Sequence, residues 1–163
     1  MIENKPRPGG EPSSSVFEID DLSDLERRLG HRFADAGLLL RALTHASYAN
    51  EHLPEPDNEA LALVGDAALG LVVAEHVVTS DPAAPVGVLT PRRAELVSGP
   101  NLARWGEDLG LGPLLRLGRG EDQTGGRTRE SILATALEAL LGAIYLEAGI
   151  PAVQRVVASL AEW

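Results

Sequence analysis

Apolar side chains recur every three to four positions over most of this chain, a spacing that predicts amphipathic or buried helices. Loops rich in Pro and Gly separate the periodic segments. No stretch shows the strict alternation of a β-strand, and no internal repeat or second domain is visible. The pattern therefore predicts an all-α fold, with helices over about residues 21–29, 36–49, 58–79, 90–109 (broken near Gly99-Pro100), 128–148 and 151–163.

The sequence divides into a short N-terminal segment and one domain. Residues 1–18 are rich in Pro, Gly and Ser and lack periodicity, which predicts a disordered tail. Residues 19–163 then form one domain, long enough to bury a core. Segment 58–79 is apolar nearly all round, so we expect that helix to be central and buried. Residues 110–127 are rich in glycine and too irregular for a long element.

Composition narrows the class of protein. Hydrophobic residues make up 44% of the 163 residues but aromatics only 4%, so Leu, Val and Ala must build the core. There is no cysteine, which excludes disulfides and thiolate metal sites and fits a cytoplasmic protein. No uncharged apolar run reaches the ~18 residues of a membrane span, so we expect no membrane association. The net charge of -10 argues mildly against a nucleic-acid binder, although local clusters matter more than the sum.

Asp66 and Glu138 are the candidate chemical residues, because each is a single acid inside a long apolar stretch. Burying a carboxylate is costly unless it is paired, protonated or bound to metal. Two such acids on two helices indicate one shared polar site, and carboxylates are typical ligands of Mg²⁺. The alternative is that each acid forms a structural ion pair with an arginine.

Several segments occur in the same order as in the catalytic domain of ribonuclease III, which residues 21–163 resemble. The resemblance implies an all-helical endonuclease-type domain that acts as a homodimer on double-stranded RNA and uses Mg²⁺. The matching segments are LTHAS at 43–47, NEALALVGDA at 58–67, RAELV at 93–97, NLA at 101–103, LRLGRGE at 115–121, GGRTRESILA at 125–134 and EALLGA at 138–143.

The departures from the family pattern fall on its metal ligands. The family's four carboxylates correspond to positions 62, 66, 135 and 138, and here Ala62 and Thr135 replace two of them. Positions 62 and 66, and 135 and 138, have the spacing that puts two side chains on one helical face. The resemblance therefore implies that Asp66 and Glu138 bind Mg²⁺, or Mn²⁺, weakly or not at all, and that endonuclease activity is lost or strongly reduced.

Two other acids are candidates for compensation. Glu59 is retained from the family signature and is a catalytic candidate; it lies one turn from Ala62, roughly 4.5 Å along the helix axis. Glu121 matches a family acid in the glycine-rich loop and is a further candidate ligand. Three readings stay open: an impaired domain that acts on double-stranded RNA, an active Mg²⁺-dependent endoribonuclease with a compensated site, and a non-catalytic assembly or regulatory partner of an active paralogue.

The resemblance also implies partner contacts. Arg119, Arg127 and Arg129 fall where the family contacts the RNA backbone, although solvated surface arginines are the alternative. Leu63 replaces an aromatic residue that the family presents to the other subunit, and ordinary core packing is its alternative. We expect a homodimer, with a heterodimer with a paralogue as the other possibility. Many bacterial members continue into a double-stranded-RNA-binding domain; this sequence ends at Trp163, so we expect its RNA affinity to depend on the dimer's own groove.

Overall fold

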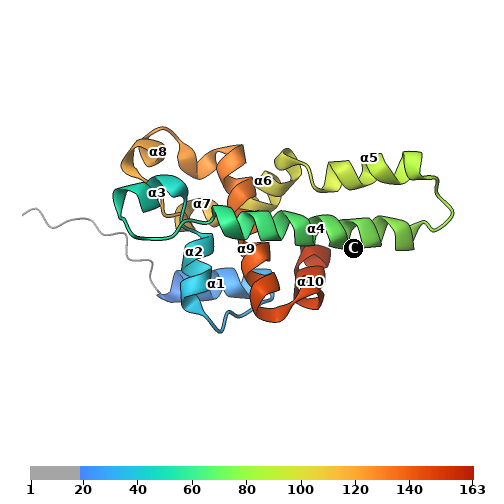
Figure 1. The fold of residues 1–163 in the computed structure, drawn as a ribbon, viewed down its shortest axis with the longest axis horizontal. Helices are drawn as coiled ribbons and strands as arrows, with labels where there is room; N and C mark the ends of the chain where they lie inside the picture. The colour runs from blue at the N-terminus through green and yellow to red at the C-terminus, as the bar shows by residue number, and fades with distance from the viewer. Residues whose placement is uncertain (1–18) are drawn as a thin grey trace, which may run out of the picture.

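The computed structural model describes residues 19–163, and the predicted tail, 1–18, lies outside this range. The described part of the chain is helical throughout and contains no strand, which confirms the all-α prediction. Figure 1 shows the arrangement. The helices are α1 (Ile19–Leu29), α2 (Ala36–Ala42), α3 (Ala46–Glu51), α4 (Glu59–Ser80), α5 (Val86–Leu96), α6 (Gly99–Asp108), α7 (Leu111–Leu114), α8 (Arg119–Gln123), the 3-10 turn η1 (Gly126–Thr128), α9 (Glu130–Ala148) and α10 (Ile150–Leu160).

Helices α4 and α9 cross at the centre of the domain, with α2, α6 and α10 packed around α9 and α5 running along α4 (Figure 1). Glycines allow the crossing to be close. A Cβ added at Gly142 would lie 2.0 Å from the carbonyl oxygen of Leu61, so the two backbones touch. Leu69, Leu137 and Leu140 are fully buried around this crossing. Packing of this kind, more than helix propensity, stabilises the two long helices.

The predicted helix over 36–49 is wrong as a single element. The chain leaves α2 after Ala42 and starts α3 at Ala46, because the segment between them pairs with a distant one. The amide of Arg116 donates to the Leu43 carbonyl at 2.9 Å, and the amide of His45 donates to the Arg116 carbonyl at 3.0 Å. These bonds form an isolated parallel bridge between Thr44 and Arg116.

The start of α5 also differs from the prediction. The helix begins at Val86 after Pro85, whereas the Thr90-Pro91 pair predicts a later start. Pro91 therefore lies inside the helix, where it lacks the N–H that would donate to the carbonyl of residue 87. No residue of α5 is buried, so this helix is held mainly by its contacts along α4 and with α6.

Helices α4 and α9 are each long and apolar enough to cross a membrane, judged by length and composition alone. A buried core helix can have the same length and composition, and in this domain α4 and α9 pack against one another. Helix α4 is central, but the expectation that it is buried is met on one face only. Leu63, Leu71 and Val78 are exposed, so α4 has one face in the core and an apolar face in solvent.

Candidate functional site

Asp66 and Glu138 lie together where α4 and α9 cross. A Cβ added at Gly65 would lie only 1.7 Å from the carbonyl oxygen of Glu138, so the residue next to Asp66 contacts the Glu138 backbone. Burial raises the pKa of Glu138 to about 6, and the negative charge of Asp66 contributes to the rise. Two carboxylates on two helices thus share one site, as the sequence predicts.

The depth of this site differs from the expectation. Asp66 is exposed and Glu138 is only half-buried, so neither is a carboxylate sealed in an apolar core. Asp66 faces the solvent side of α4, whereas the neighbouring Leu61 and Leu69 face the core. The pair is therefore accessible to a cation or to a polar ligand. No arginine or lysine neutralises it among the ion pairs of residues 19–163.

The two substituted positions flank this pair. Ala62 is buried one turn before Asp66, and Thr135 is half-buried one turn before Glu138 on α9. Ala62 offers a methyl group and Thr135 a neutral hydroxyl, neither of which replaces an anionic ligand of a hard dication. Within residues 19–163, no three Asp, Glu or His side chains gather closely enough to hold a metal ion. The site thus supplies two carboxylates and no third.

Glu59 belongs to a different cluster. It is exposed in the first turn of α4, and its charge, with those of Arg129 and Asp57, acts on His45. Burial lowers the pKa of His45; Glu59 opposes this shift and Arg129 adds to it. The His45 Nδ1 accepts from the amide of Ser47 at 3.2 Å and so caps α3. The charge of Asp66 acts on Glu138, whereas the charge of Glu59 does not.

Glu121 and the three arginines gather in the glycine-rich loop, which we define as residues 115–129. Glu121 pairs with Arg129, and no charge of Glu121 acts on Glu138. Arg127 points back into the loop, where Asp122 accepts from its Nε at 2.7 Å. Arg119 stands out into solvent, with 92% of its side chain exposed. The loop therefore brings the predicted RNA-contacting residues together but gives them different surroundings.

Leu63 lies on the solvent face of α4, with 74% of its surface exposed. It borders an apolar hollow of about 430 Å³ beside the junction of α9 and α10. A single exposed leucine is common on a monomer, but a contiguous apolar surface of this kind is typical of an interaction site. The hollow is lined by Leu63, Val64, Ala67, Ala68, Leu71, Tyr145 and Ile150.

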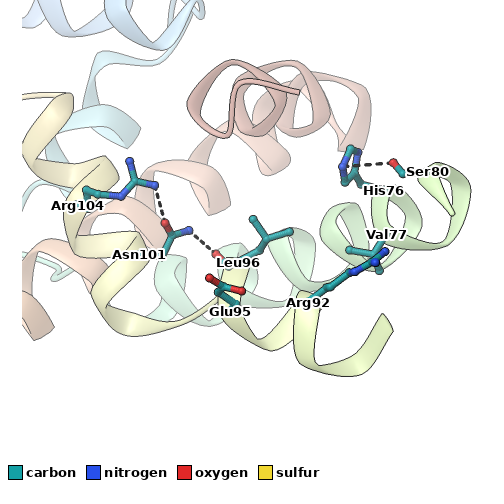
Figure 2. Close-up of a pocket in the computed structure, with 8 residues that line it drawn as sticks. All are labelled: His76, Val77, Ser80, Arg92, Glu95, Leu96, Asn101 and Arg104. Carbon is teal, nitrogen blue, oxygen red and sulfur yellow. Dashed lines mark hydrogen bonds between the residues drawn. The ribbon is translucent and has the colours of Figure 1, made fainter. Parts of the chain in front are cut away.

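A groove of about 410 Å³ between α4, α5 and α6 is a feature that sequence reasoning missed (Figure 2). Its two arginines are already partnered: Arg92 donates to Asp81 at 3.1 Å, and Arg104 lies 3.6 Å from Asp108. Glu95 adds a further carboxylate at its edge. The charges around the groove therefore largely cancel, and nothing in it favours an anion.

Comparison with known proteins places this geometry in a family. The model of the family described as "Ribonuclease-III-like" matches residues 35–161. The chain is 46% identical over 140 residues to a "Ribonuclease 3" of Caldanaerobacter subterraneus subsp. tengcongensis, which covers 85% of this chain and 61% of that protein. It is 49% identical over 133 residues to a "Ribonuclease 3" of Streptomyces coelicolor, covering 82% and 48%. The chain thus spans about half to three-fifths of the length of these relatives.

Comparison with solved structures leads to the same family. The nuclease domain of ribonuclease III from Campylobacter jejuni superposes with a TM-score of 0.82 at 37% identity, covering 86% of this chain and 96% of that one. That structure is described as showing flexibility in a region involved in dimer formation. A family model over most of the chain and a close structural likeness confirm the resemblance seen in the motifs. This chain belongs to the ribonuclease-III-like family, and its helical fold is that of a ribonuclease III nuclease domain.

Proposed function

We propose that this chain acts on double-stranded RNA in RNA processing, as a binding domain whose endonuclease activity is lost or strongly reduced. The observation that carries the proposal is the pair of non-ligand residues, Ala62 and Thr135, on the two helices that bring Asp66 and Glu138 together. The fold and the crossing are kept, while half of the expected carboxylates are absent.

The available metal ligands explain why endonuclease activity should be reduced. A bound Mg²⁺ would supply water activation and charge stabilisation for an in-line phosphoryl displacement. The residues here fit such an ion poorly, because within residues 19–163 only Asp66 and Glu138 offer it carboxylates at the crossing. Burial, together with the charge of Asp66, also raises the pKa of Glu138 to about 6, so protons compete with a cation for this carboxylate below pH 6. We therefore expect weak binding of Mg²⁺ or Mn²⁺ and propose no catalytic step.

The RNA would contact the glycine-rich loop. Arg119, Arg127 and Arg129 lie there together, and arginine donors suit phosphate oxygens. The acidic balance of the chain should keep the affinity modest, and added salt should lower it further. Binding to RNA would take place in the cytoplasm.

The exposed apolar face of α4 supports a dimer. Leucine at position 63 is smaller than an aromatic residue but still removes apolar surface from water when it enters a partner's hollow. A homodimer is the simplest arrangement, since Leu63 and the hollow lie on the same face. A heterodimer with a catalytically complete paralogue would use the same surface, and the chain would then act as an assembly or regulatory subunit.

An active, compensated site is the alternative function. The retained Asp66–Glu138 pair favours it, and Glu59 or Glu121 would have to complete the ligand set. Glu121 pairs with Arg129, and Glu59 lies where its charge acts on His45 and not on Glu138. Compensation would therefore require these side chains to leave their present positions.

A gain-of-function experiment tests the proposal. The double variant Ala62→Glu with Thr135→Asp rebuilds four carboxylates, and we expect it to cut an RNA duplex in Mg²⁺ at least tenfold faster than the wild-type chain. The matched control, Ala62→Gln with Thr135→Asn, has similar size and no added charge, so it should stay as inactive as the wild type. Equal activity of the rebuilt variant and this control, with both folded and bound to RNA, would contradict the proposal.

A further inference from the structure

Arg127 is partly buried, and each nitrogen of its guanidinium group donates to another group of the protein. Its Nη1 donates to the carbonyl oxygens of Gly112 at 3.0 Å, Pro113 at 3.2 Å and Leu115 at 2.9 Å. Its Nε and Nη2 donate to the two carboxylate oxygens of Asp122 at 2.7 and 3.2 Å. The carbonyls belong to the end of α7, where a helix leaves such groups without intrahelical partners. Arg127 therefore ties the end of α7 to α8.

Arg129 is engaged in a similar way. Its Nη1 donates to Glu121, and its Nη2 lies 3.2 Å from the carbonyl oxygen of Thr124, just after α8. Glu121 is partly buried, so this pair is less screened than a pair at an open surface. Two of the three arginines proposed to contact RNA thus already bind acidic side chains of the glycine-rich loop. Arg116, the fourth arginine of residues 115–129, pairs with Glu55.

Arg119 differs from both. Its backbone amide donates to the Glu51 carboxylate at 2.9 Å, and the amide of Gly118 donates to Ser47 Oγ at 2.9 Å, which fixes the start of α8 on α3. Its side chain is almost fully exposed and meets Glu51 only at 3.8 Å. The backbone at this position is held while the guanidinium is free to meet a ligand.

We propose that Arg127 is a positioning residue that holds α8 in place, and that Arg119 supplies the phosphate contact of this loop. This division of roles rests on the proposed binding of RNA. A phosphate that recruited Arg127 would have to break its bonds to the carbonyls and to Asp122, leaving the partly buried carbonyls of Gly112 and Leu115 unsatisfied. A phosphate that recruits Arg119 displaces a single long ion contact in solvent, which is worth little.

The salt dependence of duplex binding separates the two roles. Each phosphate contact contributes about 0.9 to the slope of log K against log[salt] on a duplex. We expect Arg119→Gln to lower this slope by about that amount. Arg127→Gln should weaken binding at every salt concentration and leave the slope unchanged, because the contacts themselves are kept but misplaced. Arg127→Lys keeps the charge and loses the planar fork, so it should behave like Arg127→Gln.

Hydrogen exchange of the free protein provides a readout that needs no RNA. Arg127→Gln, Arg127→Lys and Asp122→Asn should all speed exchange of backbone amides in residues 112–124, whereas Arg119→Gln should not. If the wild-type chain binds no duplex, the proposed function fails, and the exchange rates still decide the role of Arg127. Unchanged exchange in Arg127→Gln, or a slope that falls in Arg127→Gln and is restored by Arg127→Lys, would overturn the inference.

Discussion

The α-carbon of Gly65 lies against the backbone of Glu138, so closely that a Cβ on residue 65 would sit 1.7 Å from the Glu138 carbonyl oxygen. This contact brings Asp66 on α4 beside Glu138 on α9. The same glycine thus serves the core and the candidate site: it lets the helices touch, and the touching helices bring the carboxylates together. Any side chain at position 65 must separate the helices.

The first prediction follows from this contact. Gly65→Ala should lower the free energy of unfolding by about 3 kcal/mol or more, because backbone atoms of α9 occupy the space of the new methyl group. Gly87→Ala is a matched control in helix α5, where a Cβ meets nothing within 4 Å. The control should be neutral or slightly stabilising, since alanine favours helix. Urea denaturation measures both variants; similar values for the two would show that the crossing is looser than described.

The second prediction concerns Glu138 and pH. Its pKa of about 6 lies above the ordinary value of 4.5, so the folded chain binds more protons than the unfolded chain between these values. Stability contributed by this group is therefore lost as pH rises through 6. Glu138→Gln should stabilise the metal-free protein by about 1 kcal/mol at pH 8, after allowance for solvent screening, and by less at pH 4.5.

Urea denaturation with a chelator at the two pH values measures this difference. Glu107→Gln removes an exposed acid of α6 and is the control; as a surface substitution it should change the free energy of unfolding by no more than about 0.5 kcal/mol. If Glu138→Gln were destabilising at pH 8, burial and the charge of Asp66 would not disfavour the ionised form of Glu138 as we describe.

The third prediction concerns Glu147, which lies near the end of α9 and outside the sequence motifs that match the family. Its carboxylate accepts from the amides of Ala34 and Asp35 at 3.0 Å each and from His31 Nε2 at 3.1 Å. Burial alone would raise the pKa of Glu147, but these bonds outweigh burial and lower it. Glu147→Gln should cost about 1–3 kcal/mol at pH 7, because an amide cannot accept all of these bonds.

The pH dependence supplies the control for this variant. A group with a lowered folded pKa stabilises the protein above its unfolded pKa and loses that contribution as pH falls through the folded value. The difference between wild type and Glu147→Gln should therefore shrink below pH 4.5. Thermal unfolding at pH 7 and pH 3.5 measures it, and a difference that stays constant would mean that the charge of Glu147 is unimportant.

The fourth prediction tests the exposed face of α4. Leu63→Lys places a charge at the edge of the apolar hollow and should shift the protein from dimer to monomer in light scattering at tens of micromolar. Leu53→Lys changes a leucine that is equally exposed, at 77%, but lies in the loop before α4. This control should leave the mass unchanged. A wild-type chain that is monomeric under these conditions would remove the basis for the proposed dimer.

Hydrophobic periodicity predicted the helical fold and most helix limits, because α4, α9 and α10 are defined by local patterns. It failed between residues 43 and 45, where the chain leaves the helix to pair with Arg116, which lies 72 residues after Thr44 in sequence. It also failed at the start of α5. A long-range bridge and a helix that tolerates an internal proline have no signal in local spacing.

The candidate site was predicted in part. The shared position of Asp66 and Glu138 followed from the motifs, but the exposure of Asp66 depends on which face of α4 meets α9. The arginines of the glycine-rich loop were predicted as a group. Their different surroundings depend on where the carbonyls of Gly112 and Leu115 lie, and composition carries no information on that.

The most direct measurement is a cleavage and binding assay on one labelled RNA duplex, with Mg²⁺ and separately with Mn²⁺, using the wild-type chain and Asp66→Ala. We predict a gel shift by the wild-type chain and no cleavage, or only traces, in either metal. Rapid cleavage that disappears in Asp66→Ala would contradict the proposed loss of activity, and would mean that two carboxylates with an unrecognised ligand are sufficient.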